Sequence, residues 1–324
     1  MADTRRMTGS KWKGPRPDAP SPWKSTRERP VRPSARVADG TTDAPARGKA
    51  PRAADETRNT SRARPEPAED AARAARPGPE IRLYGFNACL AAFAARADDL
   101  RKVYLTEARI AALKPVLAWC VQHRLGYRVV GTGDLDKLSG SKHHEGVCFE
   151  MRRHAPLDLA ALLARQPASA AASLLLWLDG VGNPHNLGAL LRSAAHFGAG
   201  GVIVPRASSL DLSGAAARVA EGGAEAVVMA RVDDDATALA ALRAAGYAIA
   251  ASVPRDGSDV FHADLPPRLV LVFGAEGEGM SAALIAAADL RLTIAGSGAV
   301  ESLNIAASAA VFLAEFRRRH PLGA

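Results

Sequence analysis

Short apolar runs recur through the second half of the chain and alternate with stretches of helical spacing. Continuous apolar runs separated by helices are typical of a parallel sheet that is covered on both faces. The pattern therefore predicts an α/β domain over residues 173–324, in which ligands bind beyond the carboxyl ends of the strands. The predicted strands are 174–178, 202–204, 226–230, 247–251, 269–273 and 290–294, and the predicted helices are 187–197, 214–221, 235–245, 281–288 and 303–318.

A smaller pattern of the same kind precedes this domain, over residues 80–153. It predicts a small α/β sandwich, with residues 154–172 as a linker to the second domain. The adjacent His143 and His144 point in different directions and lack a third spaced ligand, so no metal site is expected and a polar loop that contacts RNA is the better interpretation. The predicted helices are 84–93, 109–125 and a short turn at 135–138, and the predicted strands are 102–106, 127–130 and 146–151.

The first 79 residues differ in composition. They carry 18 Lys and Arg against 10 Asp and Glu, a net charge of +8, whereas residues 80–324 carry 24 of each. They also hold 12 of the 21 prolines and contain no Leu, Ile or Phe, so we expect a disordered basic arm that buries too little apolar surface to fold. Trp12 lies between Lys11 and Lys13, which suits stacking on bases beside phosphates. The arm is expected to contact nucleic acid, with a passive charged linker as the alternative.

Several classes of protein and site are excluded by what the sequence lacks. No run of 18 apolar residues could span a membrane, and no apolar segment near the N-terminus forms a secretory signal. The three widely spaced cysteines, Cys89, Cys120 and Cys148, do not make a disulfide framework and are expected in the core, which indicates a reducing, cytoplasmic setting. No lysine follows Lys142, so a site in the second domain uses neither a Schiff-base lysine nor a phosphate-loop lysine.

The loop after the first strand of the second domain, residues 179–188, runs into a helix that carries Arg192. Asn186 is the expected N-cap of that helix. Arg192 lies six residues further on, which places it about 240° around the axis and off the face of Asn186. Since its neighbours are mostly apolar, we expect Arg192 on a largely buried helix, with either a functional role or a structural ion pair.

Two later loops are rich in small residues. Residues 274–281 include three glycines, which allow close backbone approach but do not match the dinucleotide fingerprint. Glu276 and Glu278 would repel a phosphate but could hold a hydroxyl, an amine or an Asn side chain. Residues 295–302 form an open loop that ends at Ser302, the expected N-cap of the last helix. That helix ends in three arginines, which we interpret as a solvated terminus that suits the helix dipole.

Together these three loops resemble the motifs of the SpoU/TrmH family of RNA ribose 2′-O-methyltransferases, within the SPOUT class. The order and spacing of three such motifs make a chance match improbable. The first folded domain, including residues 143–147, is similar to the L30e-like substrate-binding domain that often precedes the catalytic domain of this family. The resemblance covers about residues 82–320. The matching motifs are Asn183 to Gly188 with Arg192, Gly274 to Ser281, and Ile294 through Ser302 to Asn304.

The resemblance carries expectations about fold and function. It implies a deep trefoil knot at the C-terminal end of the parallel-sheet domain, and a homodimer whose site lies near the interface. It implies methyl transfer from S-adenosylmethionine to a ribose 2′-hydroxyl in tRNA or rRNA. The residues that it assigns to catalysis are Arg192, Asn186, Glu276, Ser302 and Asn304, and those that it assigns to cofactor binding are Gly274, Gly279, Ile294 and Leu303.

The third motif departs from the family, because Ala295 and Gly296 stand where members usually have Pro-Met. We expect a more mobile loop there and an altered affinity for the cofactor. In the family the arginine that matches Arg192 has been proposed as general base, but a guanidinium stays protonated in proteins and is a poor base. Arg192 could instead clamp a phosphate and stabilise the developing alkoxide. Two other hypotheses stay open, a non-catalytic RNA-binding protein on a methyltransferase scaffold and an enzyme that acts on a small nucleotide.

Overall fold

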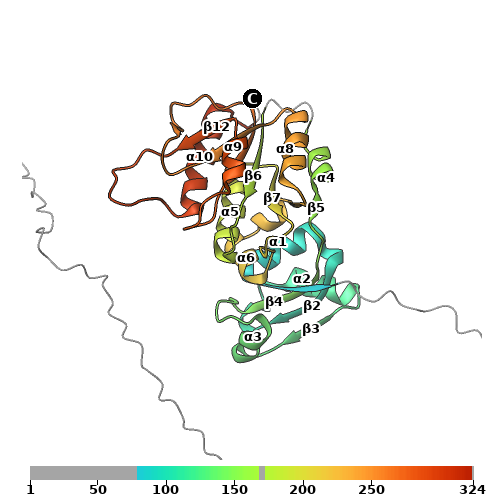
Figure 1. Cartoon of the computed structure of the whole chain (residues 1–324). Coiled ribbons are helices and arrows are strands. Elements are labelled where there is room, and N and C mark those ends of the chain that lie inside the picture. The colour runs from blue at the N-terminus through green and yellow to red at the C-terminus, as the bar shows by residue number, and fades with distance from the viewer. Residues whose placement is uncertain (1–78, 168–171, 323–324) are drawn as a thin grey trace, which may run out of the picture. The chain divides into compact units, whose positions relative to one another are not determined.

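The computed structural model describes residues 79–167 and 172–322, which form two sheets with their covering helices (Figure 1). The predicted basic arm lies outside the described residues, apart from Pro79. Within the two described ranges, no helix is both long enough and apolar enough to cross a bilayer. The first sheet and its helices form a small domain, and the second sheet and its helices form a large domain.

The small domain has four strands in the order β1-β4-β2-β3. β2 pairs in parallel with β3, and the other pairs are antiparallel. β1 was not predicted, because its alternation covers only five residues beside a proline-rich segment. The three cysteines are buried in this domain, as expected. The elements are β1 (Glu80–Tyr84), α1 (Phe86–Arg96), η1 (Ala97–Asp99), β2 (Leu100–Leu105), η2 (Glu107–Arg109), α2 (Lys114–Gln122), β3 (Gly126–Val129), α3 (Thr132–Ser139) and β4 (Val147–Arg152).

The large domain has eight strands in the order β10-β12-β9-β11-β6-β7-β8-β5, and all of their pairs are parallel. The predicted parallel sheet is thereby confirmed. Residues 157–164, which we expected within a linker, instead form the edge strand β5 and α4. The strands are β5 (Leu157–Asp158), β6 (Ser173–Leu178), β7 (Gly201–Pro205), β8 (Met229–Val232), β9 (Ala248–Ser252), β10 (Ser258–Asp259), β11 (Arg268–Phe273) and β12 (Leu290–Thr293). The helices are α4 (Leu159–Ala164), α5 (Pro184–His196), α6 (Gly214–Ala220), α7 (Gly223–Ala226), α8 (Asp235–Ala244), α9 (Ala282–Ala287) and α10 (Ile305–Arg319).

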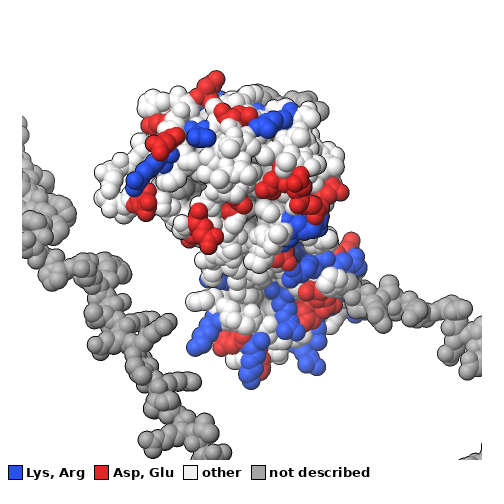
Figure 2. Space-filling model, viewed as in Figure 1, with Lys and Arg blue, Asp and Glu red and all other residues white. Residues whose placement is uncertain are grey.

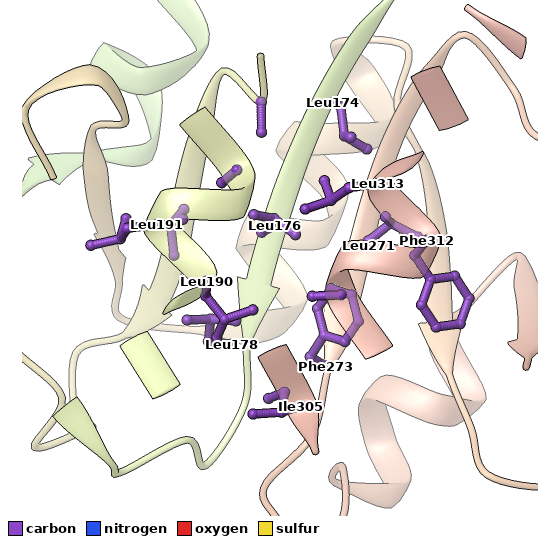
Figure 3. Packing of buried hydrophobic residues seen from close by; sticks show 14 of the residues in the cluster. Leu174, Leu176, Leu178, Leu190, Leu191, Leu271, Phe273, Ile305, Phe312 and Leu313 are labelled. Atoms are coloured by element: carbon purple, nitrogen blue, oxygen red, sulfur yellow. The ribbon is translucent and has the colours of Figure 1, made fainter. Parts of the chain in front are cut away.

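Side chains of the central strand β6 alternate between the two faces of the large sheet. Leu176 and Leu178 lie on the face that α5 and α10 cover, together with Phe273 of β11 and Phe312 of α10 (Figure 3). Trp177 lies on the other face, in a cluster with residues of α8 and α9. Burial of each such side chain contributes roughly 1.5–3 kcal/mol. Both faces are buried, which explains why β6 is apolar at nearly every position and reads as a continuous run in the sequence.

Several helix ends differ from the prediction, for example in α2, which was expected over 109–125 and spans Lys114–Gln122, and three of the differences change the role of a named side chain. The N-cap of α5 is Asn183, whose side chain accepts from the His185 amide, and not Asn186, because Pro184 begins the helix three residues earlier than expected. The N-cap of α10 is Asn304, not Ser302. The arginines at the end of α10 are not a free solvated terminus, because they bind protein groups. Arg318 and Arg319 donate to the buried Glu315, and Arg317 donates to the carbonyls of Phe197 and Gly198.

Candidate active site

The loops after β6 and β11 begin side by side at the carboxyl edge of the large sheet. β6 and β11 pair in parallel with Leu178 opposite Phe273, so their following residues leave the sheet together. Asp179 secures the two loops to each other, because its amide donates to the Phe273 carbonyl and its carboxylate accepts from the Ser281 amide over 2.8 Å. In such sheets this edge is where ligands bind.

Three of the predicted site residues meet in one hydrogen-bonded cluster. Nδ2 of Asn304 donates to Oε1 of Glu276 over 2.8 Å and to Oδ1 of Asn186 over 3.3 Å. Glu276 also accepts from the amide of Ile305 at the start of α10, at 3.3 Å. One residue from each of the three motifs therefore takes part, and Glu276 holds an Asn side chain, which was one of the three groups expected for it.

The turn that presents Glu276 is shaped by its glycines. Ala275 and Gly279 exchange both backbone hydrogen bonds at 2.9 Å, which closes a tight turn around Glu276. Gly279 has φ of 78°, a conformation that favours glycine. Gly274 leaves no space for a side chain, because a Cβ there would lie 2.3 Å from the Met280 amide nitrogen. The turn therefore requires Gly274 for its own packing.

A small pocket lies beside this cluster. Its volume is about 190 Å³, and of the predicted site residues it is lined by Asn186 and Glu276. Pockets that enclose a whole drug-sized ligand hold roughly 300–1,000 Å³, so this one fits part of a ligand. The lining residues that the sequence did not single out are Gly180, Val181, Gly182, Asn183, Ala275 and Ile305. Their loops were recognisable, but no property of these individual residues marked them.

The other predicted site residues are not joined to this cluster in the described part of the chain. Ser302 and Leu303 lie on the exposed loop before α10, and Leu303 leaves 47% of its surface exposed. No hydrogen bond connects Ser302 with Asn186, Glu276 or Asn304 among the residues described. Ile294 follows β12 and packs partly against the core of the large domain.

Arg192 does not lie in the buried position that we expected. Its side chain is 59% exposed, and its Nη2 lies 3.1 Å from Oε2 of Glu221. The apolar neighbours on α5, such as Leu190 and Leu191, face the core, whereas Arg192 faces solvent. The ion pair that we considered for Arg192 is therefore present, at the surface. Glu221 was missed because nothing in the sequence links the end of one helix to a residue 29 positions earlier.

The His143–His144 loop has a structural role that the sequence did not reveal. His144 is buried, its Nδ1 accepts from the Gly146 amide at 2.9 Å, and its Nε2 lies 3.2 Å from a carboxylate oxygen of Asp136. The expected contact of this loop with RNA does not extend to His144, because its side chain is buried. The carboxylate of Glu145 accepts from the first amide of α1, at Phe86, and thereby fixes the loop to that helix.

Comparisons with known proteins match both domains. Residues 173–314 match the SpoU rRNA Methylase family, and residues 82–157 match the family described as RNA 2'-O ribose methyltransferase substrate binding. The chain is 38% identical over 241 residues to the uncharacterized tRNA/rRNA methyltransferase YfiF of Escherichia coli O157:H7, covering 74% of this chain and 69% of that protein. It is 35% identical over 242 residues to the 23S rRNA (guanosine-2'-O-)-methyltransferase RlmB of Burkholderia sp, covering 73% and 96%.

The chain belongs to the SpoU rRNA methylase family. The resemblance seen in the three sequence motifs is thus confirmed, and so is the expected class of enzyme, an RNA methyltransferase. The fold is also that of a solved relative, the AdoMet-bound rRNA methyltransferase from Sinorhizobium meliloti, with a TM-score of 0.61 and 24% identity over 75% of this chain and 88% of that one. At this level of identity the structural match shows the fold of the SpoU methylase alone.

Proposed function

We propose that this SpoU methylase transfers the methyl group of S-adenosylmethionine to a ribose 2′-hydroxyl in tRNA or rRNA. The observation that carries the proposal is the hydrogen bond of Asn304 with both Glu276 and Asn186. It brings together one residue from each of the three motifs. Glu276 lies 28 positions before Asn304 in the sequence, and Asn186 lies 118 positions before it. A cluster of this kind at the ligand-binding edge of a parallel sheet is the default location of an active site.

The loops that follow β11 and β12 suit a nucleoside-containing cofactor. Gly274 and Gly279 belong to a turn whose backbone is tightly packed, and Leu303 offers an exposed apolar side chain. Together with Ile294 these residues would hold the adenosyl group through backbone groups and apolar contact. When bound, S-adenosylmethionine supplies the methyl group on its sulfonium. The related enzyme of S. meliloti was solved with AdoMet.

In this proposal the polar cluster orients the reacting groups. Glu276 accepts hydrogen bonds from Asn304 and from the α10 backbone, so its carboxylate keeps one direction, and Asn304 in turn directs Asn186. Ser302 lies two residues before Asn304 on the exposed loop, and we assign it to the same site on the family motif. Alignment of this kind is a large part of the catalysis of group transfer, because misplaced groups lose the advantage of proximity.

Arg192 would act on the ribose hydroxyl by electrostatics. A guanidinium remains charged in proteins and donates up to five hydrogen bonds. It therefore suits a phosphate next to the target ribose and the alkoxide that develops as the hydroxyl loses its proton. Its exposed position on α5 leaves it accessible to RNA.

The small domain has the charge that suits RNA. Residues 80–153 hold 12 Lys and Arg against 8 Asp and Glu, a net +4, whereas residues 154–324 hold 12 against 16, a net −4. Figure 2 shows basic side chains gathered over the small domain in that view. We include RNA binding by this domain and by the arm in the proposal, because phosphate contacts supply most of the non-specific affinity for nucleic acids.

Family membership supports the remaining architectural parts of the proposal. These are an L30e-like fold for residues 80–153, a trefoil knot at the C-terminal end of the SPOUT domain 173–324, a homodimer with its site near the interface, and a cytoplasmic location.

The proposal is tested by Arg192→Ala. We expect methyl transfer to RNA to be abolished, while the dissociation constant for S-adenosylmethionine, measured by calorimetry, stays near that of the wild type. Loss of methylation and cofactor binding together would mean that Arg192 is chiefly structural. A wild-type protein that binds RNA but no S-adenosylmethionine at millimolar concentration would instead support the non-catalytic RNA-binding hypothesis, for which the altered Ala295-Gly296 motif is the supporting observation.

A further inference from the structure

Among the described residues, one carboxylate forms an ion pair with the proposed catalytic arginine. Arg192 Nη2 lies 3.1 Å from Glu221 Oε2, and the two side chains keep 59% and 40% of their surfaces exposed. Exposed ion pairs contribute little to stability. A guanidinium carries five N–H donors, more than one carboxylate can accept, so Arg192 keeps donors for a ligand beside this contact. Its main effect is therefore on the direction in which the guanidinium points.

Glu221 has a backbone conformation that most side chains avoid. It ends α6 in the left-handed region, with φ of 46° and ψ of 45°. Glycine usually takes this position at a helix end, because it has no Cβ to clash. Strained non-glycine residues persist where the surrounding structure holds them, and they cluster at functional sites. The presence of a glutamate here points to a role for its side chain.

The segment that carries Glu221 packs directly on the helix that carries Arg192. A Cβ at Gly188 of α5 would lie 2.4 Å from the Ala216 carbonyl oxygen of α6. A Cβ at Gly223 would lie 2.9 Å from the Cα of Arg192. The two backbones therefore touch on both sides of Glu221, which fixes the backbone of Glu221 relative to α5.

The small domain holds the same segment at two points. Before Glu221, Arg218 lies 3.6 Å from the carboxylate of Glu145. After it, Arg96 of α1 binds Glu225 through two nitrogens, at 2.8 and 2.9 Å. Glu221 thus lies between two ion pairs that connect the large domain to the domain proposed to bind RNA.

We propose that Glu221 is a positioning residue that directs the Arg192 guanidinium toward the substrate RNA. The inference rests on the proposed function, because it requires Arg192 to act on the substrate. The left-handed end of α6 gives the carboxylate its direction, and the contacts with α5 and with the small domain keep it there. The orientation of the arginine is therefore set jointly by both domains.

The test uses the full-length protein and the substitution Glu221→Gly. Glycine suits the left-handed conformation, so we expect the melting temperature to stay equal or to rise, while the carboxylate is lost. We expect kcat for RNA methylation to fall on the order of tenfold to a hundredfold, as small misplacements of reacting groups cause. KM for RNA and the dissociation constant for S-adenosylmethionine should change by less than about threefold. Glu221→Gln, which keeps an acceptor oxygen without the charge, should lie between wild type and Glu221→Gly.

Asp233→Asn provides the matched control, because it breaks another exposed ion pair of the large domain, with Arg206. We expect wild-type kcat for it. Wild-type kcat in Glu221→Gly, with Arg192→Ala inactive, would overturn the inference and leave the proposed function standing. Activity in both Glu221→Gly and Arg192→Ala would overturn the proposed role of Arg192 itself. A higher kcat or a tighter RNA affinity in Glu221→Gly would show that Glu221 masks the arginine. A melting temperature that falls in step with kcat would show that Glu221 has a structural role. Either result contradicts the proposal that Glu221 positions Arg192.

Discussion

The side-chain amide of Asn304 donates to the Glu276 carboxylate over 2.8 Å, which joins the loop after β11 to the first turn of α10. The oxygen of the same amide accepts from the Ala306 backbone and caps that helix. Donor and acceptor ends of Asn304 are thereby both engaged, and its direction is fixed. Any residue that replaces this amide must supply a donor on one side and an acceptor on the other.

Asn304→Asp tests this requirement. The carboxylate can still cap α10, but it meets the Glu276 carboxylate where the amide donated a hydrogen bond. We expect the rate of RNA methylation to fall on the order of a hundredfold, because the cluster is displaced. The melting temperature of Asn304→Asp should fall less than that of Asn304→Ala, which loses the helix cap at a cost of about 1 kcal/mol. A wild-type methylation rate in Asn304→Asp would remove Asn304 from the site.

Much of the fold follows from patterning. The central strands β6 and β11 are buried on both faces, so their apolar runs are unambiguous. β1 gave only a short alternation, and the order of the strands depends on contacts between segments far apart, which no local pattern contains. The shift of the α5 N-cap from Asn186 to Asn183 shows how one proline at the first helical position decides the start of a helix.

The candidate site was predictable in part. Glycine-rich loops after strands marked the correct edge of the sheet, and the residue types left Glu276 free to hold an Asn side chain. Arg192 was placed wrongly, because the apolar residues around it in sequence lie on the opposite side of the helix. Its partner Glu221 could not be found from the sequence, since the left-handed conformation that places it is normally marked by glycine.

Gly188→Ala should destabilise the protein. A Cβ there would lie 2.4 Å from the Ala216 carbonyl oxygen, so α5 and α6 must move apart. We expect a loss of about 1–3 kcal/mol in the free energy of unfolding, measured in urea. Gly133→Ala is the control, because Gly133 lies in α3 with no neighbour within 4 Å of the added Cβ. It should gain about 0.5–1 kcal/mol through helix propensity. Equal effects of the two substitutions would contradict the close crossing of α5 and α6.

Glu315 makes stability depend on pH. The Arg318 guanidinium, with a further contribution from Arg319, lowers the pKa of the Glu315 carboxyl to about 2. A carboxyl with a lowered pKa stabilises the fold above its unfolded pKa of about 4.3, and this contribution is lost as the pH falls toward 2. Glu315→Gln should therefore lower the free energy of unfolding by about 1–3 kcal/mol at pH 7, and the difference from wild type should shrink between about pH 4 and 2.

The control for that measurement is Glu278→Gln, on the exposed turn after β11. Chemical unfolding of the three proteins at several pH values gives the comparison. We expect Glu278→Gln to follow the wild type throughout. A gap between wild type and Glu315→Gln that stays constant from pH 7 to pH 3 would contradict the role given to the Arg318 and Arg319 contacts.

Deletion of residues 1–78, which lie outside the described residues, should weaken RNA binding and flatten its dependence on salt. Each phosphate contact contributes about 0.7 to 0.9 to the slope of log affinity against log salt concentration. Several arm residues in contact with RNA would therefore change the slope by more than about 2. Titrations of the full chain and of residues 79–324 with the same RNA, at several salt concentrations, measure this slope. An unchanged slope would show that the arm is a passive spacer.

We propose above all that this protein methylates a ribose 2′-hydroxyl of tRNA or rRNA, and that Arg192 acts on that hydroxyl. Total RNA from cells that lack the gene is incubated with S-adenosylmethionine and either wild-type or Arg192→Ala protein, and the nucleosides are analysed by mass spectrometry. We predict a 2′-O-methylated nucleoside that appears with wild-type protein and is absent with Arg192→Ala. No new methyl group, or one carried on a base, would contradict the account.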